Sequence, residues 1–173
     1  MPLEPFHRFF PDVAQAEVRS VHVIDDPIIP PGDYAIIESY CTEPDCDCER
    51  VMLNVVEPER GIVASISFAL NPAKIPGWFD EPNPFLDPLN PQSAYAFAVL
   101  DLVEELALDE EYLERLKRHN QMVRSVVKAG ASHTSERSPW NVSGTVDPKE
   151  RRANRARWMR KFKKAARRKP RRR

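Results

Sequence analysis

The sequence predicts an α+β domain in which an antiparallel β-meander of about four strands packs with two antiparallel helices. Strand-like runs separated by short turn segments fill the first part of the chain, which favours antiparallel pairing. Fourteen of the 17 prolines lie in residues 1–91, so a long helix is not expected there. Helical spacing begins after residue 90. We therefore expect a globular domain over 1–130, a flexible linker over 131–147 and a basic tail over 148–173.

The four strands are predicted from β-branched residues and partial alternation of apolar and polar positions. The second and third are the clearest, and they flank a short loop, so they should pair as an antiparallel hairpin. The turn sequence Pro-Glu-Arg-Gly then leads into the last strand. The predicted strands span residues 17–25, 33–41, 49–57 and 62–70.

The proline-rich segment 71–91 should form neither a long helix nor a regular β-ladder. It is too apolar for a solvated linker, so we expect it to lie extended and ordered against the domain. Its large apolar residues are Ile75, Trp78, Phe79, Phe85, Leu86 and Leu89.

Two helices are predicted from capping residues and periodicity. Asn90 followed by Pro91 is a typical helix start, and apolar residues over 95–106 indicate a largely buried helix. Asp109 is expected to cap the second helix, and Gly130 to end it.

All three cysteines lie within eight positions, in the loop of the predicted hairpin. Cys41, Cys46 and Cys48 should therefore lie close enough together to bind one metal ion. Zinc prefers sulfur and nitrogen ligands and is usually four-coordinate at structural sites, so one ligand remains to be found. The candidates are His22 first, because its strand should neighbour the hairpin, and then His7, Glu43, Asp45, Asp47 or water.

Other interpretations of the cysteines remain open. The acids around the loop attract a cation, but they also raise thiol pKa values and so disfavour metal-free reactivity. The thiols are alternatively reduced and unliganded, or two of them form a redox disulfide. A Cys46–Cys48 disulfide would be strained and labile, whereas Cys41 could pair more easily with Cys46 or Cys48 across the hairpin. A metal with an open fourth position, or a redox pair, would make the protein an enzyme.

Few other residues suggest chemistry. The chain contains no P-loop or dinucleotide-binding fingerprint. His119 follows Lys117 and Arg118 and is expected on an exposed helix face. Glu17 and Arg19 should share one face of their strand, where pairing with Glu38 would give either a salt bridge or a polar site near the cysteines.

The formal net charge of zero hides two oppositely charged parts. Residues 149–173 hold 15 of the 26 Lys and Arg and one of the 26 Asp and Glu, which leaves 11 basic and 25 acidic residues in 1–148. The tail therefore carries +14 and the rest of the chain −14. Such a tail is typical of a segment that binds a polyanion.

Nucleic acid, RNA in preference, is the predicted partner of the tail. Basic residues supply phosphate contacts without base specificity. Trp158 and Phe162 favour stacking on unpaired bases. The alternatives are docking on the acidic domain or on a partner protein, and binding to an anionic membrane surface. The predicted contacts are Arg151, Arg152, Arg155, Arg157, Trp158, Arg160, Lys161, Phe162, Lys163, Lys164, Arg167 and Arg168.

The N-terminus has no apolar signal region, and no apolar run is long enough to span a bilayer. We therefore expect a cytoplasmic protein, which also fits the absence of a disulfide framework.

Three stretches carry a resemblance to a known group of proteins. They are "GDYAIIESYCTEPDCDCERVMLNVV" (32–56) and "NPFLDPLNPQSAYA" (83–96), followed by "EEYLERLKRHNQMVR" (110–124). Together they resemble uncharacterised bacterial proteins that share a Tyr-Cys-x4-Cys-Asp-Cys hairpin and often end in a SEC-C type zinc motif. The resemblance implies that Cys41, Cys46 and Cys48 form a site, but it implies no reaction. The SEC-C tail is absent here, because no cysteine follows Cys48.

Overall fold

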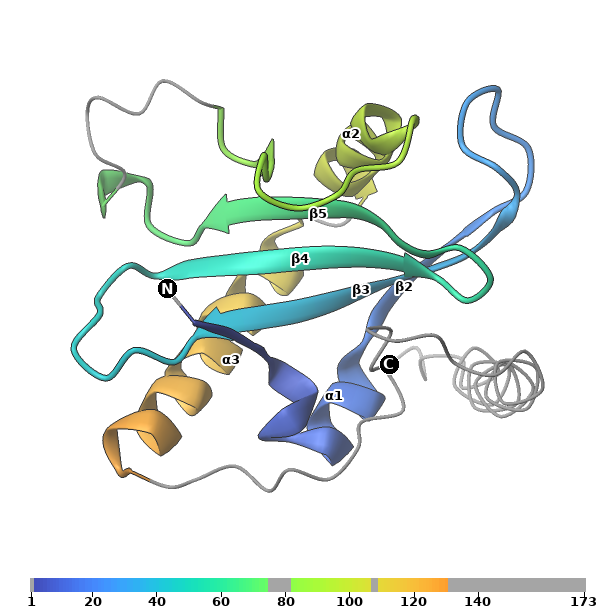
Figure 1. Ribbon diagram of the computed structural model, residues 1–173. Helices are drawn as coiled ribbons and strands as arrows, with labels where there is room; N and C mark the ends of the chain where they lie inside the picture. Colours follow the sequence, from blue (N-terminus) through green and yellow to red (C-terminus); the bar gives the residue numbers. More distant parts are fainter. Residues whose placement is uncertain (1, 75–81, 107–108, 131–173) are drawn as a thin grey trace. The chain divides into compact units, whose positions relative to one another are not determined.

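The computed structural model describes residues 2–74, 82–106 and 109–130 (Figure 1). It contains one antiparallel sheet with six strands and three α-helices, so the predicted α+β class is confirmed with more strands than expected. The predicted linker and basic tail lie outside the described residues, as does part of the proline-rich segment.

The centre of the sheet consists of three predicted strands. They are β3 (Gly32–Cys41), β4 (Arg50–Glu57) and β5 (Gly61–Ala69), joined in chain order. The β4–β5 turn is stabilised by the buried Glu57 carboxylate. It accepts hydrogen bonds from the backbone N–H groups of Glu59 and Arg60, at 2.9 and 2.8 Å. The β3–β4 connection is longer and contains the cysteine loop.

Two strands share the outer edge of β3. The predicted strand β2 (Arg19–Val23) pairs with its first half, and β1 (Leu3–Pro5), which was not predicted, pairs with its end. Between them the chain forms a 3-10 helix, η1 (Phe6–Arg8), and helix α1 (Pro11–Glu17). The predicted strand over 17–25 is therefore shortened, because Glu17 ends α1.

Side-chain amides cover the opposite edge of the sheet. Strand β6 (Phe85–Leu86) pairs with only the middle of β5. On one side of it, the Gln92 amide accepts from the Ser65 N–H and donates to the Ser65 carbonyl, both at 3.0 Å. On the other side, the Asn83 amide bonds the N–H and carbonyl of Ala69 in the same way, at 2.8 and 3.0 Å. These amides satisfy edge groups that would otherwise be open to pairing with another strand.

This edge explains why the predicted helix start is wrong. Helix α2 begins at Ala96 and ends at Leu106. The Asn90 amide donates instead to the Asp87 carboxylate at 3.1 Å, and the Ser93 N–H donates to the Val63 carbonyl at 3.0 Å. Bonds to β5 thus replace the first helical turn that the Asn-Pro pair predicted.

Removing the Gln92 amide is expected to destabilise the domain. Gln92→Ala removes the bond to the N–H of the buried Ser65, whose carbonyl keeps the Asp87 N–H as a donor at 2.8 Å. The loss should lower the free energy of unfolding by about 1–3 kcal/mol. Urea denaturation would measure the change. Asn90→Ala, at the predicted cap, is the matched control and should change stability by less than about 0.5 kcal/mol. Equal losses for both variants would contradict the edge role of Gln92.

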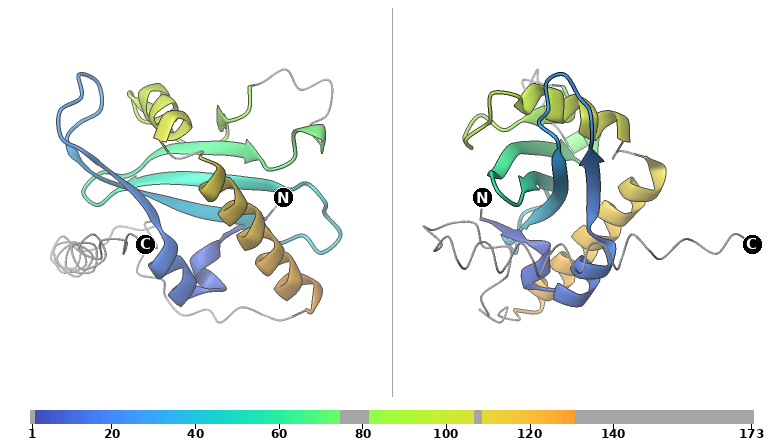
Figure 2. Two further views of the ribbon diagram at one scale, coloured as in Figure 1. Left: turned by 180° about the vertical axis from the view of Figure 1, so that it is seen from behind. Right: turned by 90° about the vertical axis from the view of Figure 1, so that its right-hand side faces the viewer.

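The core lies between one face of the sheet and helices α2 and α3 (Figure 2). Helix α3 spans Glu110–Lys128 and begins as predicted, with the Asp109 carboxylate accepting from the Tyr112 N–H at 2.8 Å. It is followed by Gly130 at φ +65°, a conformation suited to glycine. The strand residues on the core face are Tyr34, Ile36, Glu38, Tyr40, Val51, Leu53, Val55, Ala64, Ile66 and Phe68.

His7 gives the fold a pH dependence. Partial burial, with the Arg8 guanidinium beside it, lowers the pKa of His7 to about 4. The unfolded chain then binds a proton at His7 below about pH 6.5, whereas the folded chain does not bind it until about pH 4. Stability should therefore fall as pH decreases through this window, by about 1–2 kcal/mol after allowance for solvent screening.

The measurement is urea denaturation at pH 7.5, 6 and 5 for the wild-type chain and for His7→Gln. The variant should lose less stability between pH 7.5 and 5 than the wild type, because its side chain does not titrate. Parallel losses in the two proteins would show that other groups cause the effect.

Candidate metal centre

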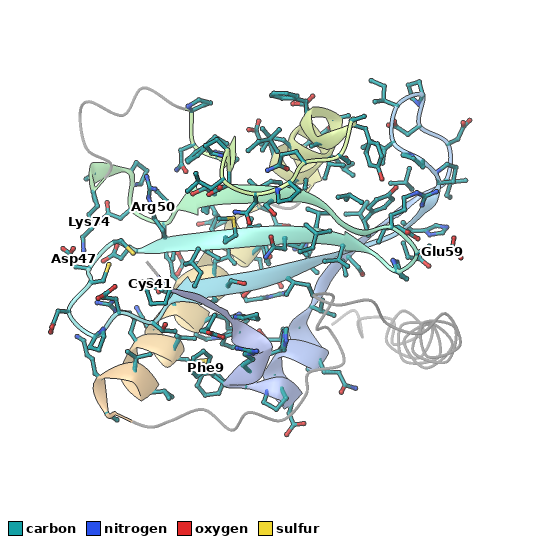
Figure 3. The ribbon with its side chains drawn as sticks, viewed as in Figure 1. Phe9, Cys41, Asp47, Arg50, Glu59 and Lys74 are labelled. Carbon is teal, nitrogen blue, oxygen red and sulfur yellow. The ribbon has the colours of Figure 1, made fainter. Side chains whose placement is uncertain are left out.

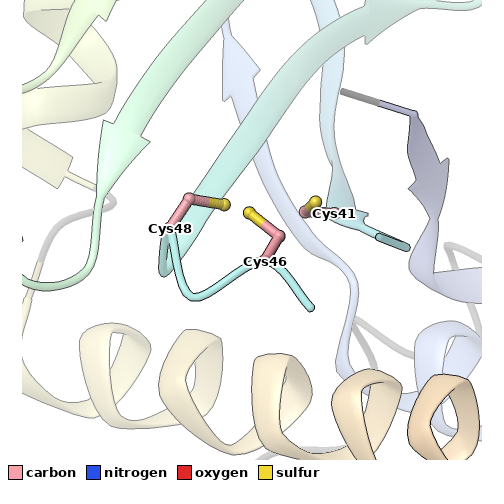
Figure 4. Close-up of side chains that lie close together, drawn as sticks. All are labelled: Cys41, Cys46 and Cys48. Carbon is pink, nitrogen blue, oxygen red and sulfur yellow. The ribbon is translucent and has the colours of Figure 1, made fainter. Parts of the chain in front are cut away.

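The three cysteines meet at the end of the β3–β4 hairpin. Cys41 is the last residue of β3, and Cys46 and Cys48 lie in the loop that leads into β4. Their sulfur atoms all lie within 4.8 Å of one another, and the Cys46 and Cys48 side chains point toward each other (Figure 4). Cys41 is buried, the other two are half-buried, and the three form no disulfide. The predicted convergence of the thiols is confirmed.

The loop is shaped by its own backbone. The Cys46 N–H donates to the Glu43 carbonyl at 3.2 Å, which closes a turn between the first two cysteines. Directly after Cys48, Glu49 adopts φ 44°, in the left-handed region that side chains other than glycine rarely adopt. The Leu70 N–H holds the Glu49 carbonyl at 2.9 Å. This contact from the end of β5 fixes the strained residue beside the thiols.

Lys74 also stabilises the cysteine loop, through contacts with Asp47 and Glu49. Its ammonium group donates to the Asp47 carbonyl at 2.9 Å and to the Glu49 carboxylate at 3.0 Å, and it lies 3.4 Å from the Asp47 carboxylate. Figure 3 shows Lys74 reaching over the loop to Asp47. Two acids that flank Cys48 are thus engaged by one cation from the short helix η2 (Pro72–Lys74).

The sulfur atoms differ in their acidity. Burial raises the pKa of Cys48 to about 12, and the neighbouring sulfurs of Cys46 and Cys41 add to this. Burial acts in the same direction on Cys46. Hydrogen bonds from the Cys48 N–H and from the other two thiols, together with Arg124, outweigh it and lower the pKa of Cys46. A negative charge is therefore better accommodated on the sulfur of Cys46 than on that of Cys48, and a cation bound there would displace the remaining thiol protons.

The donor set fits a thiophilic ion. In a tetrahedral zinc site with Zn–S bonds of about 2.3 Å, neighbouring sulfurs lie about 3.8 Å apart, so the sulfurs here need to close by no more than about 1 Å. Within the described residues, no histidine or carboxylate joins the three sulfurs as a further ligand.

His22, the first candidate for a fourth ligand, is not brought to the cysteines. It lies opposite Asp33, near the start of β3, and its ring bonds the Asp33 carboxylate at 2.6 Å. Cys41 is at the other end of the same strand, about 26 Å along the chain at the usual rise per residue. The antiparallel register, which the sequence did not specify, places the histidine at the wrong end.

The chain has no match among known families, curated proteins or solved structures. The chemistry of the centre therefore has to follow from its own geometry.

A second polar cluster lies in the core, and its histidine was wrongly predicted to be exposed. The His119 side chain is 1% exposed. Its Nδ1 lies 2.7 Å from the Glu38 carboxylate, and its Nε2 lies 3.0 Å from the Glu17 carboxylate. The Tyr40 hydroxyl also donates to Glu38, at 2.8 Å. Glu17, from α1, and Glu38, from β3, therefore meet at one imidazole of α3.

The inner part of this polar cluster, His119 and Glu38, is buried. Phe6 stacks on the His119 ring with centroids 3.9 Å apart. Burial and the neighbouring Glu38 carboxylate raise the pKa of Tyr40 and Tyr112 well above the usual value, so both hydroxyls stay protonated. The cluster links three elements, with His119 and Glu38 buried and Glu17 32% exposed, which indicates a role in holding α3 on the sheet.

The sequence suggested that Arg19 pairs with Glu38, and the structure gives it a partner at the start of α3. Its guanidinium forms an ion pair with Asp109, the N-cap of α3, and lies 5.3 Å from the centroid of the Tyr112 ring. It therefore stabilises the start of α3.

In the part of the chain that the structure describes, no helix is long and apolar enough to cross a membrane. The predicted nucleic-acid contacts, from Arg151 to Arg168, lie outside that part.

Proposed function

We propose that this chain is a metal-binding protein in which Cys41, Cys46 and Cys48 hold one zinc ion. The observation that supports the proposal is the convergence of the three sulfurs, within 4.8 Å, at the end of a hairpin. The role is structural: the ion joins the end of β3 to the loop that starts β4.

Zinc is preferred over other ions for three reasons. Thiolate donors select zinc over magnesium or calcium, which prefer oxygen ligands. A zinc ion also requires no particular geometry from its d electrons, so it tolerates a loop that supplies three sulfurs and a solvent ligand. The acids around the loop attract a divalent cation.

The proposal is tested by titrating the reduced, metal-free chain with zinc in competition with a chromophoric chelator. We expect one zinc per chain, with proton release on binding. Cys46→Ser should abolish competition, whereas Asp45→Asn, which alters an exposed acid of the same loop, should retain it. A metal-free protein with three readily titrated thiols and no zinc binding would refute the proposal.

An enzymatic role is the second candidate, and the donor count favours it. Catalytic zinc sites keep one position open, and three protein ligands are typical of them. Alternatively, two of the thiols act as a redox pair. Thiol counting after mild oxidation distinguishes a zinc centre from a redox pair. A zinc centre protects the thiols, whereas a redox pair loses two of them.

We further propose that the basic segment 148–173 binds nucleic acid, with RNA preferred. Its formal charge of +14 supports strong, salt-sensitive binding, and Trp158 and Phe162 supply stacking surfaces. A chain truncated at Asp147 should lose binding to single-stranded RNA. Trp158→Ala should weaken binding to single strands more than to duplexes. Undiminished binding after truncation would assign the interaction to another part of the chain.

A further inference from the structure

We infer that the three-cysteine centre also binds trivalent arsenic or antimony, presented as the neutral hydroxide, with all three sulfurs bonded to one atom. The inference rests on the proposed function only in using the same three thiols, and it does not require zinc to bind.

The main support for this binding is the number of sulfur ligands. The centre offers three sulfurs, and among the described residues no histidine or carboxylate adds a fourth ligand. Zinc usually takes four ligands, so it needs an additional donor here. Trivalent arsenic forms three bonds and keeps a lone pair in the fourth direction. The centre therefore supplies all the bonds that trivalent arsenic requires.

Among the described residues no carboxylate groups with the three sulfurs, and two of the nearby ones contact Lys74. Asp47 has a side chain that is 87% exposed, and it lies beside the Lys74 ammonium at 3.4 Å. Glu49 is bonded to the same ammonium at 3.0 Å. With these oxygens engaged, the surface that faces the bound atom is made of soft sulfur donors, which favours a thiophilic element over a hard cation.

The reaction is balanced without an oxidant or reductant. Arsenous acid, As(OH)₃, exchanges its three As–O bonds for As–S bonds to Cys41, Cys46 and Cys48. Each thiol proton leaves with a hydroxide as water, so three waters are released. Arsenic remains trivalent and the sulfurs are not oxidised.

Charge also favours this ligand. Three thiolates with trivalent arsenic form a neutral unit, whereas zinc with the same thiolates carries −1 and monovalent copper carries −2. Cys41 is 3% exposed, and burying an uncompensated charge beside it is unfavourable. The neutral unit is therefore the easiest of the three to accommodate at the buried end of the centre.

The test uses the full chain, reduced with a phosphine and freed of zinc. Sodium arsenite is added, and the intact protein is examined by native mass spectrometry and by thiol titration. We expect one arsenic per chain, bound with loss of three hydrogens and of all three titratable thiols. Phenylarsine oxide, which has only two exchangeable bonds, should leave one thiol titratable. Cys41→Ser and Cys48→Ser should each bind arsenite more weakly than the wild type.

Three results would overturn the inference: a thiol that remains titratable with saturating arsenite, a Cys41→Ser chain that binds as tightly as the wild type, or equal binding by the urea-unfolded chain. The last would show that the folded geometry contributes nothing. Zinc titration of the same preparation separates the two proposals. Zinc binding without arsenic binding refutes only this inference, and arsenic binding without zinc binding refutes only the zinc centre.

Discussion

Glu38→Ala is expected to lower the free energy of unfolding by about 3–5 kcal/mol, because it removes one partner from a buried polar network and leaves the others in place. The carboxylate accepts from the Tyr40 hydroxyl at 2.8 Å and faces the His119 ring at 2.7 Å. Without it, the buried imidazole and the buried hydroxyl each lose their shortest hydrogen bond. Chemical denaturation monitored by circular dichroism measures the change.

A matched control is available on α3. Glu114 has an exposed side chain and pairs with Lys117 at 2.7 Å. Glu114→Ala should cost less than about 0.5 kcal/mol, since exposed ion pairs contribute little. Our assignment of the polar cluster to the stability of the fold would be wrong if Glu38→Ala and Glu114→Ala had similar effects.

Removal of zinc should produce a loss of comparable size. A ligand that binds only the folded state stabilises it by about 4 kcal/mol when its free concentration is a thousand times its Kd. Zinc-loaded protein should therefore unfold at higher urea than chelator-treated protein. The difference should disappear in Cys46→Ser, which lacks one of the three converging sulfurs.

The same comparison also tests where the metal acts. Because an ion held by the three cysteines would join β3 to the loop before β4, amide exchange at the ends of these strands should slow on zinc binding. An equal gain in stability for Cys46→Ser would place the metal elsewhere in the chain.

Much of the sheet follows from the sequence because the central strands are local. Strands β3, β4 and β5 are neighbours in the chain and joined by short connections, so their pairing needs no distant information. The same locality made the cysteine cluster predictable, since all three thiols belong to one hairpin. Strand β1 was missed because it is short and pairs with β3 from far away in the sequence.

The misplaced residues depend on tertiary contacts. Asn90 has the chemistry of a helix cap, but the edge of β5 binds the residues that follow it. The position of His22 was predicted wrongly because it depends on strand register, which periodicity does not determine. His119 carried a usable signal: with Tyr112, Leu116 and Val123 it shares the buried stripe of α3 at helical spacing. The charged residues before it, Lys117 and Arg118, led instead to the prediction of an exposed position.

X-ray absorption spectroscopy of the zinc-loaded chain would count the sulfur ligands of the bound ion. It would thereby test the claim that Cys41, Cys46 and Cys48 act together as one metal centre. We predict a zinc shell with three sulfurs at about 2.3 Å and one lighter donor. A shell with one sulfur or none, in a protein whose three thiols still titrate, would contradict it.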